Sequence, residues 1–340
     1  MLRNGVTRRL ASTTPVLSCT RCNGRRQCLS FLRPEPASRG NRPVKAQRVC
    51  IVSSLLVACP VPAQETQVTF ASSEVAPGIY MLQGQGGFAG GNLGLLTGTD
   101  GVVLIDDGLE PLSDMTLAAV RDISDQPVDF VINTHVHGDH LGGNAAFSDA
   151  GATIIGHDNL RRRLVEQESG DAGATPPPAA SLPQITFDQS MTLHLNGHEA
   201  FVFHVAAAHT DGDAVIFFRE ANVIHTGDVM FNGLFPFIDL DSGGSLEGYL
   251  AAQEDILSLA GPETRIIPGH GPVASKADLE AAHDMLSDAR GLVKRLTDEG
   301  KSIDEILAAN PLAQYHAKWN WEFITTERMT RTIHRALTQD

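Results

Sequence analysis

The chain has 340 residues, of which 42% are hydrophobic, and carries a formal net charge of −14 at pH 7. Residues 1–48 hold eleven Lys and Arg and a single acidic residue, which leaves 15 basic against 39 acidic residues in the remainder. Such an acidic body lacks the clustered positive charge that binds nucleic acid or anionic membrane surfaces. We therefore expect a small-molecule substrate and no nucleic-acid partner.

The first 63 residues have the layout of an export signal. The apolar run 49–58 follows three basic residues and precedes the small residues Val61 and Ala63, which suit a cleavage site. The run is too short to cross a bilayer, so we expect no transmembrane segment in the mature body. The sequence predicts a leader over residues 1–63, one folded domain over residues 64–340, and a periplasmic or secreted protein.

Three further interpretations of the leader stay open. Residues 56–59 (Leu-Val-Ala-Cys) resemble a lipobox, which would make Cys59 the lipid anchor of an outer-membrane lipoprotein. Residues 1–43 could be a misannotated extension upstream of a start at Val44, or residues 1–26 could be a mitochondrial presequence. All five cysteines lie in the first 59 residues, so the body offers no thiolate to a metal or to catalysis.

The first half of the body reads as strands separated by Gly and Asn/Asp turns. The predicted strands lie near residues 67–72, 78–82, 92–97, 102–106 and 128–133. A helix is expected at 112–122, because its apolar residues recur at helical spacing. The strand at 128–133 leads directly into a histidine-rich run, which therefore belongs on a loop at the carboxyl end of that strand.

The second half repeats this alternation and ends in amphipathic helices. We expect strands near 152–156, 191–195, 200–205, 214–219, 222–226 and 264–268. Helices are expected near 158–167, 246–259, 275–295, 302–308 and 320–337. Residues 168–183, with three consecutive prolines, are expected to form a loop. Two sheets covered on the outside by helices are the natural packing of these elements.

Residues 134–140 (Thr-His-Val-His-Gly-Asp-His) carry the strongest chemical signal in the sequence. His135 and His137 alternate with small residues, so both imidazoles point the same way in an extended segment and can share one metal ion. Asp139 and His140 follow on the turn, where they can reach a second ion nearby. Three histidines and an aspartate at these spacings seldom arise by chance, whereas His135 alone would be an ordinary surface residue.

Further motifs recur in order along the chain. They are Asp106 in Leu-Ile-Asp-Asp-Gly, His209 in His-Thr-Asp-Gly-Asp, Asp228 in His-Thr-Gly-Asp, and His270 in Pro-Gly-His-Gly-Pro. With the histidine run, this series resembles the metallo-β-lactamase superfamily over roughly residues 75–275. One departure is Ala208, which stands where that family often has glycine before the histidine.

The resemblance implies an α/β fold, the four-layer αββα metallo-β-lactamase sandwich. It implies two Zn²⁺ ions per chain, one held by His135, His137 and His209 and the other by Asp139, His140 and His270, with Asp228 between them. In this interpretation a metal-bound hydroxide attacks the substrate. Asp139 and Asp228 are the expected catalytic residues, and Asp106 is expected to fix the loop by hydrogen bonds.

Three further segments carry aromatic side chains, and each has two possible roles. The glycine-rich residues 83–92 could form a flap tipped by Phe88 or a tight hairpin. The aromatic loop 230–238 follows Asp228 closely, and we favour a hydrophobic substrate wall over plain packing. Trp319, Trp321 and Phe323 are assigned to the start of the last helix, where a core stripe is the default interpretation and an active-site lid the alternative.

The leading functional hypothesis is an exported binuclear zinc hydrolase that opens a cyclic amide or ester bond, with β-lactam hydrolysis as the first expectation. An aspartate at the position of Asp228 resembles the pattern of the glyoxalase II and lactonase branches more closely than that of well-known β-lactamases. A lactonase or thioesterase is therefore the close alternative. A mononuclear iron sulfur dioxygenase and a non-catalytic, metal-binding periplasmic protein are the other candidates.

Overall fold

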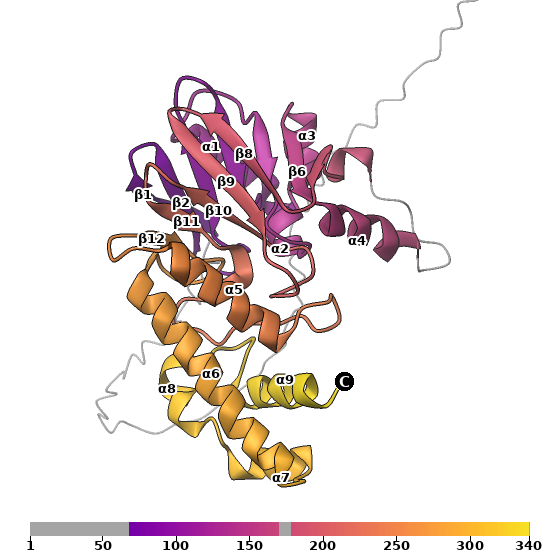
Figure 1. The fold of residues 1–340 in the computed structure, drawn as a ribbon. Helices are drawn as coiled ribbons and strands as arrows, with labels where there is room; N and C mark the ends of the chain where they lie inside the picture. Colours follow the sequence, from indigo (N-terminus) through magenta and orange to yellow (C-terminus); the bar gives the residue numbers. More distant parts are fainter. Residues whose placement is uncertain (1–67, 170–177, 340) are drawn as a thin grey trace, which may run out of the picture. The chain divides into compact units, whose positions relative to one another are not determined.

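The structure is a computed structural model, and it describes residues 68–169 and 178–339, which belong to one compact unit. Two sheets organise this unit (Figure 1). The first has the order β1 to β7, formed by Thr69–Ala76, Ile79–Gln85, Leu93–Thr97, Val102–Ile105, Phe130–Ile132, Thr153–His157 and Ile185–Phe187. The second has the order β13-β12-β11-β10-β9-β8, formed by Ala274–Ser275, Arg265–Ile267, Val223–His225, Ala214–Phe218, His198–His204 and Ser190–Leu195.

Nine α-helices occur among the described residues. Their bounds, from α1 to α9, are Ser113–Arg121, Gly138–Leu141, Asn144–Asp149, Asp158–Ser169, Leu246–Leu259, Lys276–Asp298, Ile303–Ala309, His316–Trp319 and Thr326–Thr338. Short 3₁₀ turns occur at Glu110–Leu112, Ala179–Ser181, Gly227–Val229 and Ala313–Tyr315. In the part of the chain that the structure describes, no helix combines the length and apolar character that a membrane span requires.

The central strands are apolar on both faces, because both faces are covered. Alternate residues of a strand point to opposite sides of the sheet. Ile105 of β4 and Ile132 of β5 therefore contribute to the core between the sheets, whereas Leu104 and Val131 pack beneath α1 and α3. In the second sheet, Val215 of β10 likewise faces away from the first sheet and packs with residues of α5. This arrangement is the predicted αββα sandwich.

A fourth hydrophobic cluster joins the C-terminal helices to the loop that follows Asp228. It contains Phe235 and Ile238 of that loop together with buried residues of α5, α6, α7 and α9. The Phe235 N–H donates to the Trp319 carbonyl at 2.7 Å, and the Trp321 indole N–H donates to the Phe235 carbonyl at 2.9 Å. The C-terminal helices therefore fix the position of loop 230–238.

The predicted elements are found, with differences at short or late segments. Five short elements were not expected: β7, β13, α2, α3 and α8 are two to six residues long and leave too little room for a periodic pattern. The last helix begins at Thr326 rather than at residue 320, since the Thr325 side chain accepts a hydrogen bond from the Arg328 N–H. Trp321 and Phe323 therefore lie in the connection between α8 and α9.

Three expectations fall on residues that the structure does not describe. The leader over residues 1–63, its cleavage site and the lipid anchor at Cys59 all precede residue 68, where the described residues begin. The loop predicted over residues 168–183 is described only in part: α4 ends at Ser169, and a 3₁₀ turn occupies Ala179–Ser181.

Phe218 of β10 tests the packing between the sheets, because its side chain is 1% exposed in that core. We expect Phe218→Ala to lower the free energy of unfolding by about 3–5 kcal/mol, through lost burial and the cavity that remains. Urea unfolding followed by circular dichroism measures this change. Ile185→Ala, at a side chain that is 43% exposed, is the matched control, with an expected change within about 0.5 kcal/mol. Equal effects of the two substitutions would contradict the assigned core.

Candidate metal centre

The candidate site lies where strands of both sheets end. β4 and β5 run parallel, as do β11 and β12, so the carboxyl ends within each pair lie side by side. Asp106 follows β4, the histidine run follows β5, Asp228 follows β11, and His270 follows β12. His209 lies on the loop between β9 and β10. The fold thus brings together all seven predicted ligands, which are far apart in the sequence.

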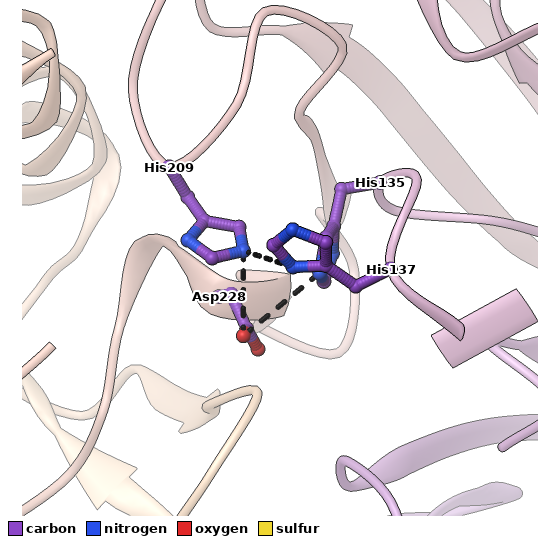
Figure 2. A group of neighbouring side chains, drawn as sticks. All are labelled: His135, His137, His209 and Asp228. Carbon is purple, nitrogen blue, oxygen red and sulfur yellow. Dashed lines mark hydrogen bonds and ion pairs between the residues drawn. The ribbon is translucent and has the colours of Figure 1, made fainter. Parts of the chain in front are cut away.

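The first group of side chains consists of His135, His137, His209 and Asp228 (Figure 2). One ligand atom from each lies within 4.8 Å of the others. The His209 Nε2 atom lies 2.9 Å from His137 Nδ1 and 3.6 Å from the Asp228 Oδ2 atom. Three imidazoles and a carboxylate converging on one point are a donor set that suits Zn²⁺.

The second group consists of Asp139, His140 and His270, whose ligand atoms also lie within 4.8 Å of one another. The His140 Nε2 and His270 Nε2 atoms are each 3.6 Å from Asp139 Oδ2. Asp228 reaches this group too, because its Oδ1 atom is 3.1 Å from His140 Nε2 and its Oδ2 atom is 3.5 Å from His270 Nε2. Asp228 therefore lies between the two groups, as expected for a bridging carboxylate.

Unsatisfied polar atoms show that the two groups suit metal ions. Among the described residues, the buried atoms His135 Nε2, His140 Nε2 and Asp228 Oδ1 have no hydrogen-bond partner. Buried polar atoms are normally hydrogen-bonded, and each unpaired one carries a free-energy cost. All three atoms belong to residues of the two ligand groups, so cations bound in these groups would satisfy each of them.

The protonation states depend on burial and on the carboxylates. Burial lowers the pKa of the His135 imidazole well below its usual value and the pKa of His209 to about 4, so both rings are neutral and able to bind a metal. Burial also disfavours the cation of His140, but the carboxylates of Asp228, Asp139 and Asp106 outweigh it and raise its pKa well above the usual value. Conversely, the surrounding imidazoles, His140 first, overcome the effect of burial on Asp228 and hold its pKa well below the usual range.

Asp106 connects the histidine run to strand β4. Its carboxylate accepts hydrogen bonds from the Thr134 N–H at 2.7 Å and from the Thr134 hydroxyl at 2.8 Å, and it lies 2.7 Å from His140 Nδ1. The bond to Nδ1 leaves Nε2 of His140 free to face the centre. The supporting role expected of Asp106 agrees with these contacts.

Asp239 is a supporting residue that the sequence analysis missed. Its Oδ2 atom lies 2.9 Å from Nε2 of His137, so the ring donates there and presents Nδ1 to the first ligand group. Hydrogen bonds from His137 and Ser242 overcome the effect of partial burial and lower the pKa of Asp239. The signal available in the sequence was its position directly after the aromatic loop 230–238.

Gly91 shows how closely the glycine-rich segment approaches the centre. A Cβ atom at this position would lie 2.2 Å from the His140 ring, so no other residue fits without displacing it. The neighbouring backbone is fixed as well, since the Gly91 N–H donates to the Asp139 carbonyl at 3.1 Å and the Asn92 N–H to the Gly269 carbonyl at 2.7 Å. The segment is the connection of the β2–β3 hairpin, and it holds Phe88 beside His270 with 62% of the side chain exposed.

Aromatic side chains border the two ligand groups, and we call them the aromatic rim: Phe88, Phe231, Phe237, Trp321 and Phe323. Phe231 stacks on the His270 ring at 4.8 Å between centroids, and Phe237 stacks on the His137 ring at 5.6 Å. Phe235 of the same loop is fully buried. Loop 230–238 thus serves both as a wall at the site and as core packing.

The connection between α8 and α9 completes the rim. The Trp321 ring lies 6.2 Å from that of His270, and Phe323 lies 5.4 Å from Phe237 with 46% of its side chain exposed. Trp319, by contrast, is 5% exposed and belongs to the helical core. The default interpretation as a core stripe is therefore right for Trp319. Trp321 packs against the same cluster while its ring also borders His270, and Phe323 lies outside the core.

Asp239→Asn tests the support of His137. The asparagine amide can donate its own N–H to Nε2 of His137, so it no longer favours the tautomer that carries its proton on Nε2 and leaves Nδ1 for the metal. We therefore expect the zinc affinity to fall about 10–100-fold. Competition with a chromogenic chelator measures the affinity. Asp241→Asn is the matched control, because Asp241 pairs with Arg335 on the surface and contacts no predicted ligand. An unchanged affinity in Asp239→Asn would contradict the assigned role.

Zinc binding should release protons. Since its carboxylate neighbours keep His140 protonated in the metal-free protein, a metal ion must displace about one proton at neutral pH. The apparent affinity should accordingly fall as the pH is lowered. Calorimetric titrations in buffers of different ionisation enthalpy count the released protons. A pH-independent affinity without proton release would show that His140 is already neutral.

Comparison with known proteins agrees with this geometry. A model of the metallo-β-lactamase superfamily matches residues 86–270. A hydroxyacylglutathione hydrolase from Pelagibacter ubique (strain HTCC1062) is 27% identical over 174 residues, which are 50% of this chain and 63% of that relative. The chain thus matches less than two thirds of the length of this relative.

Solved structures show the same fold at low sequence identity. A metallo-β-lactamase from Pontibacter korlensis superposes with a TM-score of 0.53 at 18% identity, covering 64% of this chain and 99% of that one. A stereoselective inverting sec-alkylsulfatase from Pseudomonas sp. superposes with a TM-score of 0.61 at 17% identity, covering 79% of this chain and 50% of that one. With a family match over more than half of its length, the chain belongs to the metallo-β-lactamase superfamily, whose members are mostly metal-dependent hydrolases.

Proposed function

We propose that the chain is an exported, binuclear zinc hydrolase that cleaves a lactone, thioester or other ester bond. The observation that carries this proposal is the position of Asp228, whose two carboxylate oxygens lie 3.1–3.8 Å from imidazole nitrogens of both ligand groups. A carboxylate between two metal sites resembles the glyoxalase II and lactonase branches, and the curated relative is a hydroxyacylglutathione hydrolase. β-Lactam opening, the first expectation from the sequence, is the competing substrate class.

The chain supplies the arrangement that hydrolysis needs. Two zinc ions, when bound, lower the pKa of water to near neutrality and stabilise negative charge that develops on a carbonyl oxygen. His135, His137, His209 and Asp228 would hold one ion, and Asp139, His140 and His270 the other, with Asp228 shared. The Asp139 side chain is 22% exposed, so it faces the solvent side of the centre, where it can orient the attacking water and hold its proton.

The donor set distinguishes this proposal from the other classes. A mononuclear iron dioxygenase needs two histidines and one carboxylate, with the remaining positions open. Here five histidines and two aspartates converge in two groups, which supports two ions. The exposed rings of Phe88 and Phe323 beside the ligand groups favour an apolar substrate group over a non-catalytic, metal-binding periplasmic protein.

Turnover of a substrate panel tests the proposal. The purified, zinc-loaded chain should hydrolyse at least one of a lactone, an acyl thioester and an aryl ester faster than the β-lactam nitrocefin. His209→Ala and Asp139→Ala should each lower kcat/KM at least about 100-fold, because each removes a metal ligand. Elemental analysis should find about two zinc ions per chain. One bound iron, or equal rates in the wild type and both variants, would refute the hydrolase.

A further inference from the structure

Arg328 lies at the outer edge of the aromatic rim. Its guanidinium carbon is 4.1 Å from the centroid of Phe323 and 5.2 Å from that of Phe237. Phe237 in turn stacks on the His137 ring, so a single aromatic ring separates the guanidinium from a predicted metal ligand. One N–H of Arg328 donates to the Phe323 carbonyl at 2.9 Å, which holds the side chain against the rim.

The charge of Arg328 has no carboxylate partner among the described residues, and its two neighbours on α9 show that this is a local property. Arg331 pairs with Glu327, and Arg335 pairs with Asp241. The body holds 39 acidic and 15 basic residues, so an arginine on this surface finds a carboxylate easily. Arg328 is instead held by two aromatic rings, and most of its donors are free for an incoming acceptor.

The position of Arg328 on its helix is also unfavourable in isolation. Thr325 caps α9 by accepting a hydrogen bond from the Arg328 N–H, so Arg328 lies in the first helical turn. Positive charge there opposes the helix dipole, which favours anions at this end. The two rings and the Phe323 carbonyl hold Arg328 at this position despite the unfavourable interaction with the dipole.

The exposed rings beside Arg328 add an apolar component. Only five large hydrophobic side chains are exposed among the described residues, and Phe88 and Phe323 of the rim are two of them. Phe88 stands at the His270 side of the centre and Phe323 at the His137 side, near Arg328. Exposed rings that border a reaction centre are suited to contact an apolar part of a substrate.

We infer that the aromatic rim and Arg328 form a substrate subsite for an acyl or aryl group that carries a carboxylate. The apolar group lies against Phe237 and Phe323, and the carboxylate accepts hydrogen bonds from the Arg328 guanidinium, whose planar donors match it. This inference rests on the proposed hydrolase, since it assigns the substrate class of the same site. It predicts that an anionic substrate is preferred over a neutral one of equal shape.

Binding of two small probes tests the subsite without catalysis. 4-Phenylbutyrate and 4-phenylbutanamide differ in charge and hardly in shape. Trp321 of the rim is one of only two tryptophans in the chain, so intrinsic fluorescence reports binding. We expect the wild type, both zinc-loaded and metal-depleted, to bind the carboxylate about ten-fold more tightly than the amide, as a charge-assisted pair provides.

Three variants assign the preference to Arg328. Arg328→Met should bind the two probes equally, whereas Arg328→Lys should keep part of the preference because it keeps the charge. Arg331→Met, one turn further along the same helix, is the matched control and should behave as the wild type. Thermal unfolding verifies that each variant is folded. If Arg328→Met does not fold, a reduced preference for the carboxylate in Arg328→Lys provides the test.

The outcomes separate this inference from the proposed function. A wild type without preference for the carboxylate, or a preference that persists in Arg328→Met, would overturn the subsite. Loss of the preference in Arg328→Met alone supports it. Absence of turnover on every substrate of the panel, together with selective probe binding, would refute the hydrolase while leaving the anion-binding role of Arg328 in place.

Discussion

The buried carboxylate of Asp228 is the constraint on which the site depends. A charge placed away from water is costly unless opposite charges or donors surround it. Here ring nitrogens of His135, His140, His209 and His270 lie within 3.8 Å of its oxygens. These rings come from three loops, one after β5, one between β9 and β10 and one after β12, so both sheets must be in register before the charge is compensated. The geometry of the centre is therefore a property of the whole sandwich.

The supporting contacts fix which nitrogen of each ring faces the centre. Asp106 binds Nδ1 of His140, Asp239 binds Nε2 of His137, and the Phe237 carbonyl lies 2.7 Å from Nδ1 of His209. Two of these contacts come from the loop after Asp228, which the C-terminal helices hold in place. Packing far from the reaction centre thus orients two ligands of the first group.

The same C-terminal segment places side chains beside the centre. Trp321, Phe323 and Arg328 come from the α8–α9 connection and the first turn of α9, well beyond the family motifs in the sequence. The motifs specify the chemistry, which is common to the superfamily, and this late segment supplies the groups that would choose among substrates. The proposed substrate subsite is accordingly encoded apart from the metal-binding motifs.

The sequence alone determined the fold class and the side chains that meet at the candidate site. The spacing in residues 134–140 depends only on backbone geometry, and the order of the later motifs, which resemble those of the superfamily, carries the rest, so the seven side chains of the two groups could be named in advance. Likewise, the alternation of apolar residues in strands such as β4 and β10 depends on a local period that is visible without a structure.

Tertiary structure alone decided the contacts that have no local signature. Asp239 supports His137 across 102 residues of sequence, and no spacing rule connects them. The sequence did not show that Trp321 and Phe323 lie outside the last helix. Their place in the connection after Trp319 depends on where α9 begins, which the Thr325 cap sets. The sequence of α9 contains three arginines, and nothing in it indicates that Arg328 is the one without a carboxylate partner among the described residues. Which of them faces a carboxylate and which faces the rim depends on long-range packing, and that is settled only when the chain folds.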